Sequence, residues 1–302
     1  MTIPEISTLT LIGSGLMGWQ IGLVCARAGY TTRLHDIRKD AMENARQQQA
    51  AKLEEWAAAG ELDEPAEAVL DRISYHPTAD EAVAGAQFVL ETVTEDLEMK
   101  RQVFAELDRI CPPAIPIATN SSSIQSSRVV AGLKNPERVM NMHFLNHPWL
   151  RPYVETMTCG QTRDEYLEIA RRLGKSLGLA SVRIHGEVQG FVFNRLWRAI
   201  KKEAMFLADE GLASIGDIDR AFMIGLRAEK GVFQMMDRAG LHIQLAIEKQ
   251  WYAESGHESD RPRAVLTDRV ERGDLGMPSG KGFYSYPDPS YEEAGWLFRG
   301  DD

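Results

Sequence analysis

A glycine-rich turn near the N-terminus constrains the fold of this chain more than any other feature. The turn spans residues 13–18 and directly follows the apolar run 9–12. A G-x-G-x-x-G turn between a strand and a helix is typical of dinucleotide-binding βαβ units, because a pyrophosphate can approach its backbone. A nicotinamide or flavin dinucleotide is therefore the first hypothesis for a ligand.

Each glycine of this turn has a separate physical task. Gly13 permits the tight turn, and Gly15 lets the phosphates approach the backbone. Gly18 lets the following helix lie close against the strand. Together with Leu16 and Met17, which lie between them, these residues form the predicted pyrophosphate site.

An acidic residue stands where the second strand of such a unit ends. The pattern predicts a helix over 19–28, closed by Gly29, and then a strand over 31–36 that ends in Asp36. A carboxylate at this place accepts hydrogen bonds from the adenosine ribose and repels a 2′-phosphate. The sequence thus favours NAD over NADP, although the guanidinium of Arg38 is a signal in the opposite direction.

Composition places the chain among ordinary globular proteins with room for two domains. It has 302 residues, of which 44% are hydrophobic and 26% charged. No apolar run reaches the roughly 20 residues of a membrane span, and the N-terminus lacks a basic segment followed by an apolar one. We therefore expect a cytoplasmic protein that does not bind a membrane.

The charge and the cysteines exclude further classes. The net charge of -10 argues against a nucleic-acid partner. Because the chain as a whole is negative, an anionic substrate would need cationic side chains at its own binding site. Cys25, Cys111 and Cys159 are odd in number and widely spaced, which indicates neither a disulfide framework nor a metal site. None of the three has the setting of a reactive nucleophile.

The hydrophobic pattern changes along the chain. Up to about residue 184, short apolar strands alternate with helical stretches, which predicts an α/β, doubly wound, Rossmann-type domain over 1–186. Beyond it, apolar residues recur at helical spacing and predict an all-helical domain over 187–302. We expect this second domain to form a homodimer, and the segment after Tyr284 to be a short surface extension.

Two further segments carry candidate catalytic residues. Asn120 and Ser122 follow a predicted strand, at the sheet edge where substrates bind in open α/β folds. His143 and Glu155 flank the segment 144–154, which is short enough to turn and return along a neighbouring strand. A glutamate beside an imidazole orients the ring and favours its protonated form, as a general base requires.

At these residues the chain resembles the 3-hydroxyacyl-CoA dehydrogenase superfamily over nearly its whole length. The matching motifs occur in order at residues 13–18, 120–124, 143–146, 190–196 and 280–284. The resemblance implies an NAD-dependent dehydrogenase in which His143 is the general acid/base and Glu155 its partner. It also implies that Ser122 contacts substrate and nicotinamide and that Asn194 donates to a substrate oxygen. Further cofactor contacts implied in this way are Asp36, Glu95, Lys100, Asn120 and Asn146.

The chain departs from the family pattern in residues expected near the substrate. Trp149 and Arg151 follow the histidine motif, and Arg227 lies in a stretch that is uncharged in the acyl-CoA enzymes. These residues favour a small anionic substrate. Among the members that act on small acids, the resemblance is greatest to those that oxidise a pyridine aldehyde carboxylate in bacterial vitamin B6 degradation.

With the pyridine aldehyde carboxylate as substrate, Trp149 would stack on the pyridine ring and an arginine would bind its carboxylate, while His143 deprotonates the aldehyde hydrate.

Three alternatives to this function remain open. Two are dehydrogenases with another substrate, either a 3-hydroxyacyl-CoA or gulonate or carnitine. The third is a protein of the lens-crystallin kind that binds NAD without catalysing a reaction.

Overall fold

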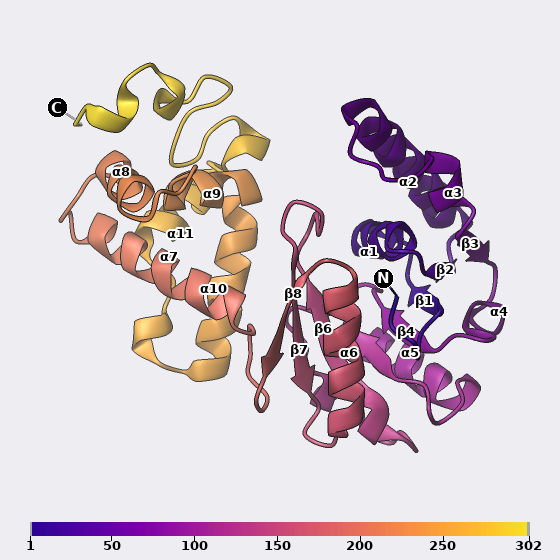
Figure 1. The fold of residues 1–302 in the computed structure, drawn as a ribbon. Coiled ribbons are helices and arrows are strands. Elements are labelled where there is room, and N and C mark those ends of the chain that lie inside the picture. The colour runs from indigo at the N-terminus through magenta and orange to yellow at the C-terminus, as the bar shows by residue number, and fades with distance from the viewer. Residues whose placement is uncertain (1, 301–302) are drawn as a thin grey trace. The chain divides into compact units, whose positions relative to one another are not determined.

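The computed structural model describes residues 2–300, which form two compact units (Figure 1). The first unit ends at Phe193 and the second begins at Asn194. Each unit is described by itself below.

The first unit is built on one eight-stranded sheet with the order β3-β2-β1-β4-β5-β6-β7-β8. Its neighbouring strands are parallel except for β6 and β7, which pair antiparallel. The strands are β1 (Thr8–Ile12), β2 (Thr31–His35), β3 (Ile73–His76), β4 (Phe88–Glu91), β5 (Ile117–Thr119), β6 (Val139–Phe144), β7 (Tyr153–Thr158) and β8 (Ala180–Ile184).

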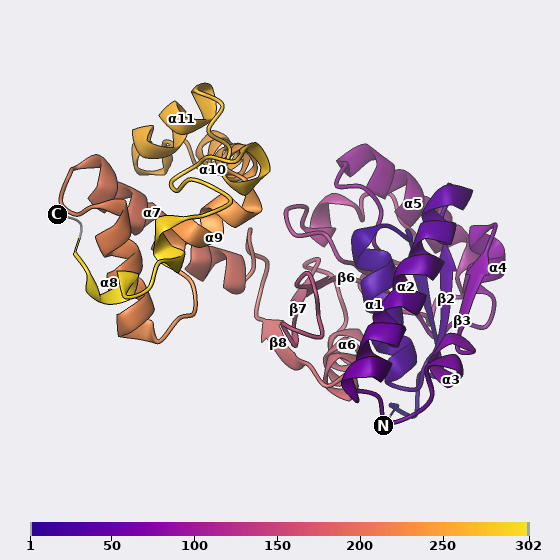
Figure 2. The same cartoon turned by 90° about the horizontal axis from the view of Figure 1, so that it is seen from above.

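Helices cover both faces of this sheet, as a doubly wound fold requires (Figures 1 and 2). The helices are α1 (Leu16–Arg27), α2 (Lys39–Ala59), α3 (Ala66–Leu70), α4 (Ala79–Val83), α5 (Leu97–Ile110) and α6 (Asp164–Ser176). One buried cluster joins α1 and α6 to the strands, and a second joins α4 and α5 to them. The predicted Rossmann-type fold class is confirmed.

The helix after the glycine turn begins earlier than the sequence indicated. We expected it from residue 19, but α1 begins at Leu16, so Gly18 lies inside its first turn. A Cβ at Gly18 would lie 2.0 Å from the carbonyl oxygen of Gly13. A glycine, normally unfavourable inside a helix, is therefore required here by the close approach of helix and turn.

The second unit is helical, as predicted. It contains α7 (Phe193–Asp209), α8 (Ile215–Leu226), α9 (Val232–Ala239), α10 (Leu241–Ser255) and α11 (Ala264–Glu271), with short 3-10 helices such as η3 (Glu258–Asp260). Buried apolar side chains of α7, α8, α9, α10 and α11 form its core. The apolar stretch 232–236 belongs mainly to this core, where Val232, Phe233 and Met236 are buried.

The segment after Tyr284 lies largely at the surface, as predicted, but it is anchored to the helical core and is not a loose extension. Tyr284 and Trp296 are buried in the helical core. The buried Asp237 accepts hydrogen bonds from the backbone N–H groups of Phe283 and Tyr284, each at 2.9 Å. Asp219 accepts another from the hydroxyl of Tyr284 at 2.8 Å. The motif at 280–284 thus anchors the tail to two buried carboxylates.

Two general features of the described residues bear on function. No helix within residues 2–300 combines the length and the apolar character that a membrane span needs. Cys25, Cys111 and Cys159 are buried and unpaired. Burial raises the pKa of Cys25 to about 12 and that of Cys111 to about 11, so neither supplies a thiolate at neutral pH.

Candidate active site

The glycine turn presents an open, uncapped helix end. Gly13 has φ +102°, and a Cβ there would lie 2.8 Å from backbone atoms of Thr92. Gly15 is the N-cap of α1 and offers no side-chain hydrogen bond to the helix. A Cβ at Gly15 would meet nothing within 4 Å. The backbone N–H groups of Leu16 and Met17 therefore begin a helix whose end accommodates a pyrophosphate, so these residues fit a dinucleotide.

Asp36 connects the end of β2 to this turn. Its Oδ2 accepts hydrogen bonds from the N–H of Ser14 at 2.8 Å and from the hydroxyl of Ser14 at 3.2 Å. Its Oδ1 accepts one from the N–H of Arg38 at 2.9 Å. The guanidinium of Arg38 forms an ion pair with Asp40. An acidic group thus stands at the adenosine end of the turn, and the nearby cation is already paired with a carboxylate.

A buried ion pair lies at the ends of β4 and α5. Lys100 is 1% exposed, and its Nζ lies 2.7 Å from Oε1 of Glu91 and 3.5 Å from Oε2 of Glu95. Glu95 also accepts hydrogen bonds from Ser121 and Ser123. Burial raises the pKa of Glu91 although Lys100 opposes this. Burial also acts to raise the pKa of Glu95, but the hydrogen bonds from Ser121 and Ser123 outweigh this effect. The pKa of Glu95 therefore lies below its ordinary value.

Glu91 was missed in the sequence analysis. Its only signal was an acid at the end of an otherwise apolar strand, where a partner cation is expected. Lys100, expected to face the cofactor, has its ammonium group buried against Glu91. The cofactor role of Lys100 stays a prediction.

Three polar residues that follow β5 and β6 differ in exposure and in hydrogen bonding. Asn120 is 9% exposed, and its Oδ1 accepts a hydrogen bond from the N–H of Phe144 at 2.8 Å, which joins β5 to β6. Ser122 is exposed on the loop that follows β5. Oδ1 of Asn146 is buried and has no hydrogen-bond partner among residues 2–300. Asn146 therefore retains an acceptor for a ligand.

His143 and Glu155 lie directly opposite each other on the antiparallel strands β6 and β7. Nδ1 of His143 is 3.5 Å from Oε2 of Glu155, and the two side chains are 6% and 0% exposed. The other oxygen, Oε1, accepts hydrogen bonds from the hydroxyl of Tyr153 (2.9 Å) and the N–H groups of Val192 (2.8 Å) and Phe193 (3.1 Å). Because Nδ1 faces the carboxylate, Nε2 is the nitrogen left to act on a substrate.

The surroundings of Glu155 keep it ionised. Burial alone would raise its pKa, but the hydrogen bonds from His143, Phe193, Tyr153 and Val192 outweigh this effect. The pKa of Glu155 therefore lies below its ordinary value. A carboxylate in this state orients the imidazole and stabilises it when it takes up a proton.

An aromatic residue fixes the other side of the imidazole. The ring of Phe191 stacks on that of His143, with centroids 4.7 Å apart and an interplanar angle of 24°. Phe191 is 2% exposed and has φ +55°, a conformation that is uncommon for a residue with a bulky side chain. The position of this ring is thus maintained at a cost in backbone energy.

Trp149 lies in an aromatic cluster. Its ring centroid is 5.8 Å from that of Trp19 and 5.4 Å from that of Trp56, and the ammonium of Lys52 lies 5.2 Å from it. Arg151, two residues further along the chain, is exposed to solvent. In the second unit, Asn194 lies in the first turn of α7, and Arg227 is the exposed, left-handed C-cap of α8. The substrate roles of these residues stay predictions.

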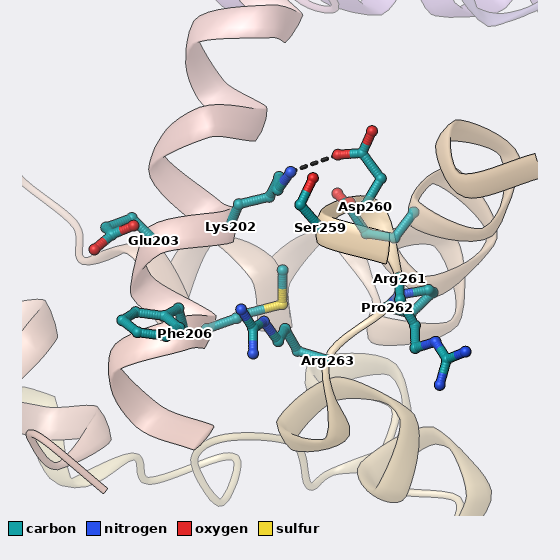
Figure 3. Close-up of a pocket in the computed structure, with 10 residues that line it drawn as sticks. Lys202, Glu203, Phe206, Ser259, Asp260, Arg261, Pro262 and Arg263 are labelled. Carbon is teal, nitrogen blue, oxygen red and sulfur yellow. Dashed lines mark hydrogen bonds and ion pairs between the residues drawn. The ribbon is translucent and has the colours of Figure 1, made fainter. Parts of the chain in front are cut away.

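The helical unit also contains a cavity of about 250 Å³ between α7, η3 and the segment 261–263 (Figure 3). Four of its charged side chains form ion pairs with one another or with close neighbours. These pairs are Lys202 with Asp260, Arg261 with Glu258, and Arg263 with Glu210. None of the predicted site residues lines the cavity, and its charged residues of both signs single out no ligand.

Fold and site together define an NAD-dependent dehydrogenase with a Rossmann-type domain and a helical domain. The family model of the 3-hydroxyacyl-CoA dehydrogenase NAD-binding domain matches residues 8–188. The model of the C-terminal domain of the same enzymes matches residues 190–286. The chain belongs to the 3-hydroxyacyl-CoA dehydrogenase family.

Curated proteins and solved structures agree with this assignment. A probable 3-hydroxybutyryl-CoA dehydrogenase of Bacillus subtilis is 32% identical over 283 residues, which cover 93% of this chain and 98% of that protein. The structure of (S)-3-hydroxybutyryl-CoA dehydrogenase from Ralstonia eutropha has a TM-score of 0.88 and 29% identity, covering 94% of this chain and 100% of its own. The structure of 5-formyl-3-hydroxy-2-methylpyridine-4-carboxylate 5-dehydrogenase is more distant. It has a TM-score of 0.74 and 26% identity over 93% of this chain and 91% of its own.

Proposed function

We propose that this chain interconverts a short 3-hydroxyacyl-CoA and the corresponding 3-ketoacyl-CoA. The observation that carries the proposal is the buried His143–Glu155 pair, which holds an imidazole with Nδ1 toward a carboxylate. Such a pair suits proton transfer to and from a hydroxyl group. The 3-hydroxybutyryl-CoA dehydrogenases among the similar proteins support this substrate class.

In this mechanism Nε2 of His143 removes the proton of the substrate hydroxyl. Bound NAD would supply the acceptor for the hydride that leaves the carbon bearing this hydroxyl group. Glu155 stabilises the imidazolium formed, and the proton then leaves to solvent. Ser122 and Asn194 are assigned to hydrogen bonds with the substrate oxygen.

The residues toward the cofactor have different roles. Gly13, Gly15, Leu16, Met17 and Gly18 would hold the pyrophosphate. Asp36 would meet the adenosine ribose, and Asn146 would supply its unpaired Oδ1 to the nicotinamide end. Glu95, Lys100 and Asn120 complete the proposed cofactor contacts.

A substrate panel tests the proposal. The purified protein is mixed with NAD and 3-hydroxybutyryl-CoA, gulonate, carnitine or the pyridine aldehyde acid, and separately with NADH and acetoacetyl-CoA, and NADH absorbance is followed. We expect turnover with the thioesters that is abolished in His143→Ala. Turnover of another panel member alone would replace the proposed substrate. No turnover with any would favour the non-catalytic alternative.

The second candidate is oxidation of 5-formyl-3-hydroxy-2-methylpyridine-4-carboxylate to the pyridine dicarboxylate. It is supported by Trp149, Arg151 and Arg227 as departures from the family pattern and by the 26% identical structure. We place it second because Trp149 already contacts Trp19 and Trp56. Trp149→Phe retains an aromatic ring in that cluster, so an increased KM for the aldehyde acid in this variant would favour the second candidate.

We also propose that the protein is a homodimer joined through its helical unit. Apolar side chains of this unit are exposed on three helices: Leu196 on α7, Ile224 and Leu226 on α8, and Ile243 and Ile247 on α10. Exposed apolar side chains of this size favour association. Sedimentation equilibrium tests the proposal, and a single species of monomer mass at micromolar concentration would refute it.

A further inference from the structure

The tyrosine at the start of β7 contacts the proposed catalytic carboxylate. Tyr153 precedes Glu155 by two residues, so both side chains project from the same face of the strand. The Tyr153 hydroxyl donates a hydrogen bond of 2.9 Å to Oε1 of Glu155, and the ring is half-buried. Burial and the hydrogen bond to Glu155 raise the pKa of Tyr153, which keeps the hydroxyl protonated as a donor at neutral pH.

The hydrogen bonds on the two carboxylate oxygens are unequal. Oε1 accepts three of them, from Tyr153, Val192 and Phe193, whereas among residues 2–300 Oε2 has only Nδ1 of His143 as a partner. The two backbone donors, Val192 and Phe193, are present whatever side chain stands at either position, except proline. The hydroxyl of Tyr153 is therefore the variable donor that helps determine how strongly Glu155 attracts a protonated imidazole.

We propose that Tyr153 is a positioning residue that holds Glu155 with Oε2 toward His143 and lowers the basicity of the His143–Glu155 pair. The inference rests on the proposed function, in which this pair transfers the substrate proton. With the hydroxyl present, part of the carboxylate charge is neutralised at Oε1. Glu155 therefore attracts a protonated imidazole less strongly than a carboxylate with fewer hydrogen bonds would.

The charged and titratable residues on the neighbouring strand β8 and in the segment after it either have other partners or are exposed. On β8, Arg183 follows the residue opposite Glu155 and forms an ion pair with Asp164. In the segment between β8 and α7, His185 and Glu187 are exposed, and Glu187 accepts a hydrogen bond from the N–H of Ser127. Within the described part of the first unit, Tyr153 is thus the titratable residue besides His143 with a hydrogen bond to Glu155.

Tyr153→Phe tests the proposal, because it removes the hydroxyl and retains the ring. The acid limb of kcat/KM for 3-hydroxybutyryl-CoA oxidation should move up by about half to one pH unit, a typical effect of one hydrogen bond to a carboxylate. On that limb, kcat/KM should fall about three- to tenfold relative to the parent enzyme. The alkaline limb of acetoacetyl-CoA reduction should move in the same direction, because the pair then acts as the acid.

One measurement and two further variants separate positioning from a general structural role. NMR titration of the His143 ring in the cofactor-free protein should show the same upward shift, and it requires no turnover. Tyr30→Phe is the matched control, because the buried Tyr30 hydroxyl accepts a hydrogen bond from the N–H of Ile3 and makes none to the pair. Tyr153→Leu should reproduce the shift, since it also lacks the hydroxyl.

The outcomes distinguish this inference from the function on which it rests. Unchanged limbs and an unchanged NMR titration in Tyr153→Phe, in an enzyme that still requires His143, would overturn the role of Tyr153 alone. An equal shift in Tyr30→Phe would do the same. Full activity of His143→Ala would instead overturn the proposed function.

Discussion

The Glu155→Gln substitution changes the hydrogen-bonding character of one atom at the proposed catalytic pair. In the parent chain Oε1 accepts three hydrogen bonds and Oε2 faces Nδ1 of His143. The glutamine oxygen should remain with the three donors, which places its NH₂ group against Nδ1. The imidazole must then accept at Nδ1 and carry its proton on Nε2, the nitrogen proposed to act as the base.

The size of the effect follows from the loss of general base catalysis. We expect kcat to fall by about 10²- to 10⁴-fold, the range that general acid–base catalysis contributes. NAD affinity, measured by calorimetry, should stay unchanged because the pair acts on the substrate. The matched control is Glu187→Gln, an exposed carboxylate whose hydrogen bond is to the backbone of Ser127. A Glu155→Gln enzyme within about threefold of the parent kcat would refute this reasoning, since that is less than general base catalysis supplies.

The remaining predictions concern the cofactor turn, the buried ion pair and the helical unit. Gly15→Ala should leave stability unchanged, because its Cβ meets nothing within 4 Å, but should weaken NAD binding about tenfold or more in calorimetry by blocking the pyrophosphate. Gly18→Ala should lower the Tm as well, since its Cβ would lie 2.0 Å from a backbone oxygen. Lys100→Met should cost about 3–5 kcal/mol in urea denaturation by leaving Glu91 buried without its cation, and Lys100→Met/Glu91→Gln should recover part of that loss. Burial raises the pKa of Asp219 from 3.8 to about 6, so the folded state binds its proton more tightly than the unfolded state. The free energy of unfolding should therefore fall as pH rises from about 4 to above 6, and Asp219→Asn should reduce this slope in urea midpoints measured across that range.

The sequence was sufficient for features that depend on local pattern. The strand, glycine turn and acid at Asp36 are contiguous, so spacing alone predicted the first βαβ unit. The separation of His143 and Glu155 indicated a turn and a returning strand, and the structure has them as directly opposed residues on β6 and β7. The change from alternating strands to helical spacing likewise predicted the helical domain.

Other features depend on contacts between distant residues, which one sequence does not reveal. Phe191 reaches the ring of His143 only because the segment after β8 returns to the pair. The anchoring of the tail was not predicted because Asp219 and Asp237, which hold it, resemble ordinary helix charges in the sequence. Tyr153 was missed although its spacing of two from Glu155 was a usable signal, since strand side chains alternate.

The central claim is that His143 and Glu155 promote hydride transfer from a 3-hydroxyacyl-CoA to NAD. The most direct test uses 3-hydroxybutyryl-CoA with deuterium on the carbon that bears the hydroxyl, incubated with NAD and the purified protein. Mass spectrometry of the reduced nicotinamide then shows whether the deuterium has been transferred. We predict deuterated NADH from the parent chain and almost none from His143→Ala in the same time. Absence of deuterated NADH from the parent chain, or equal amounts from both proteins, would contradict the account.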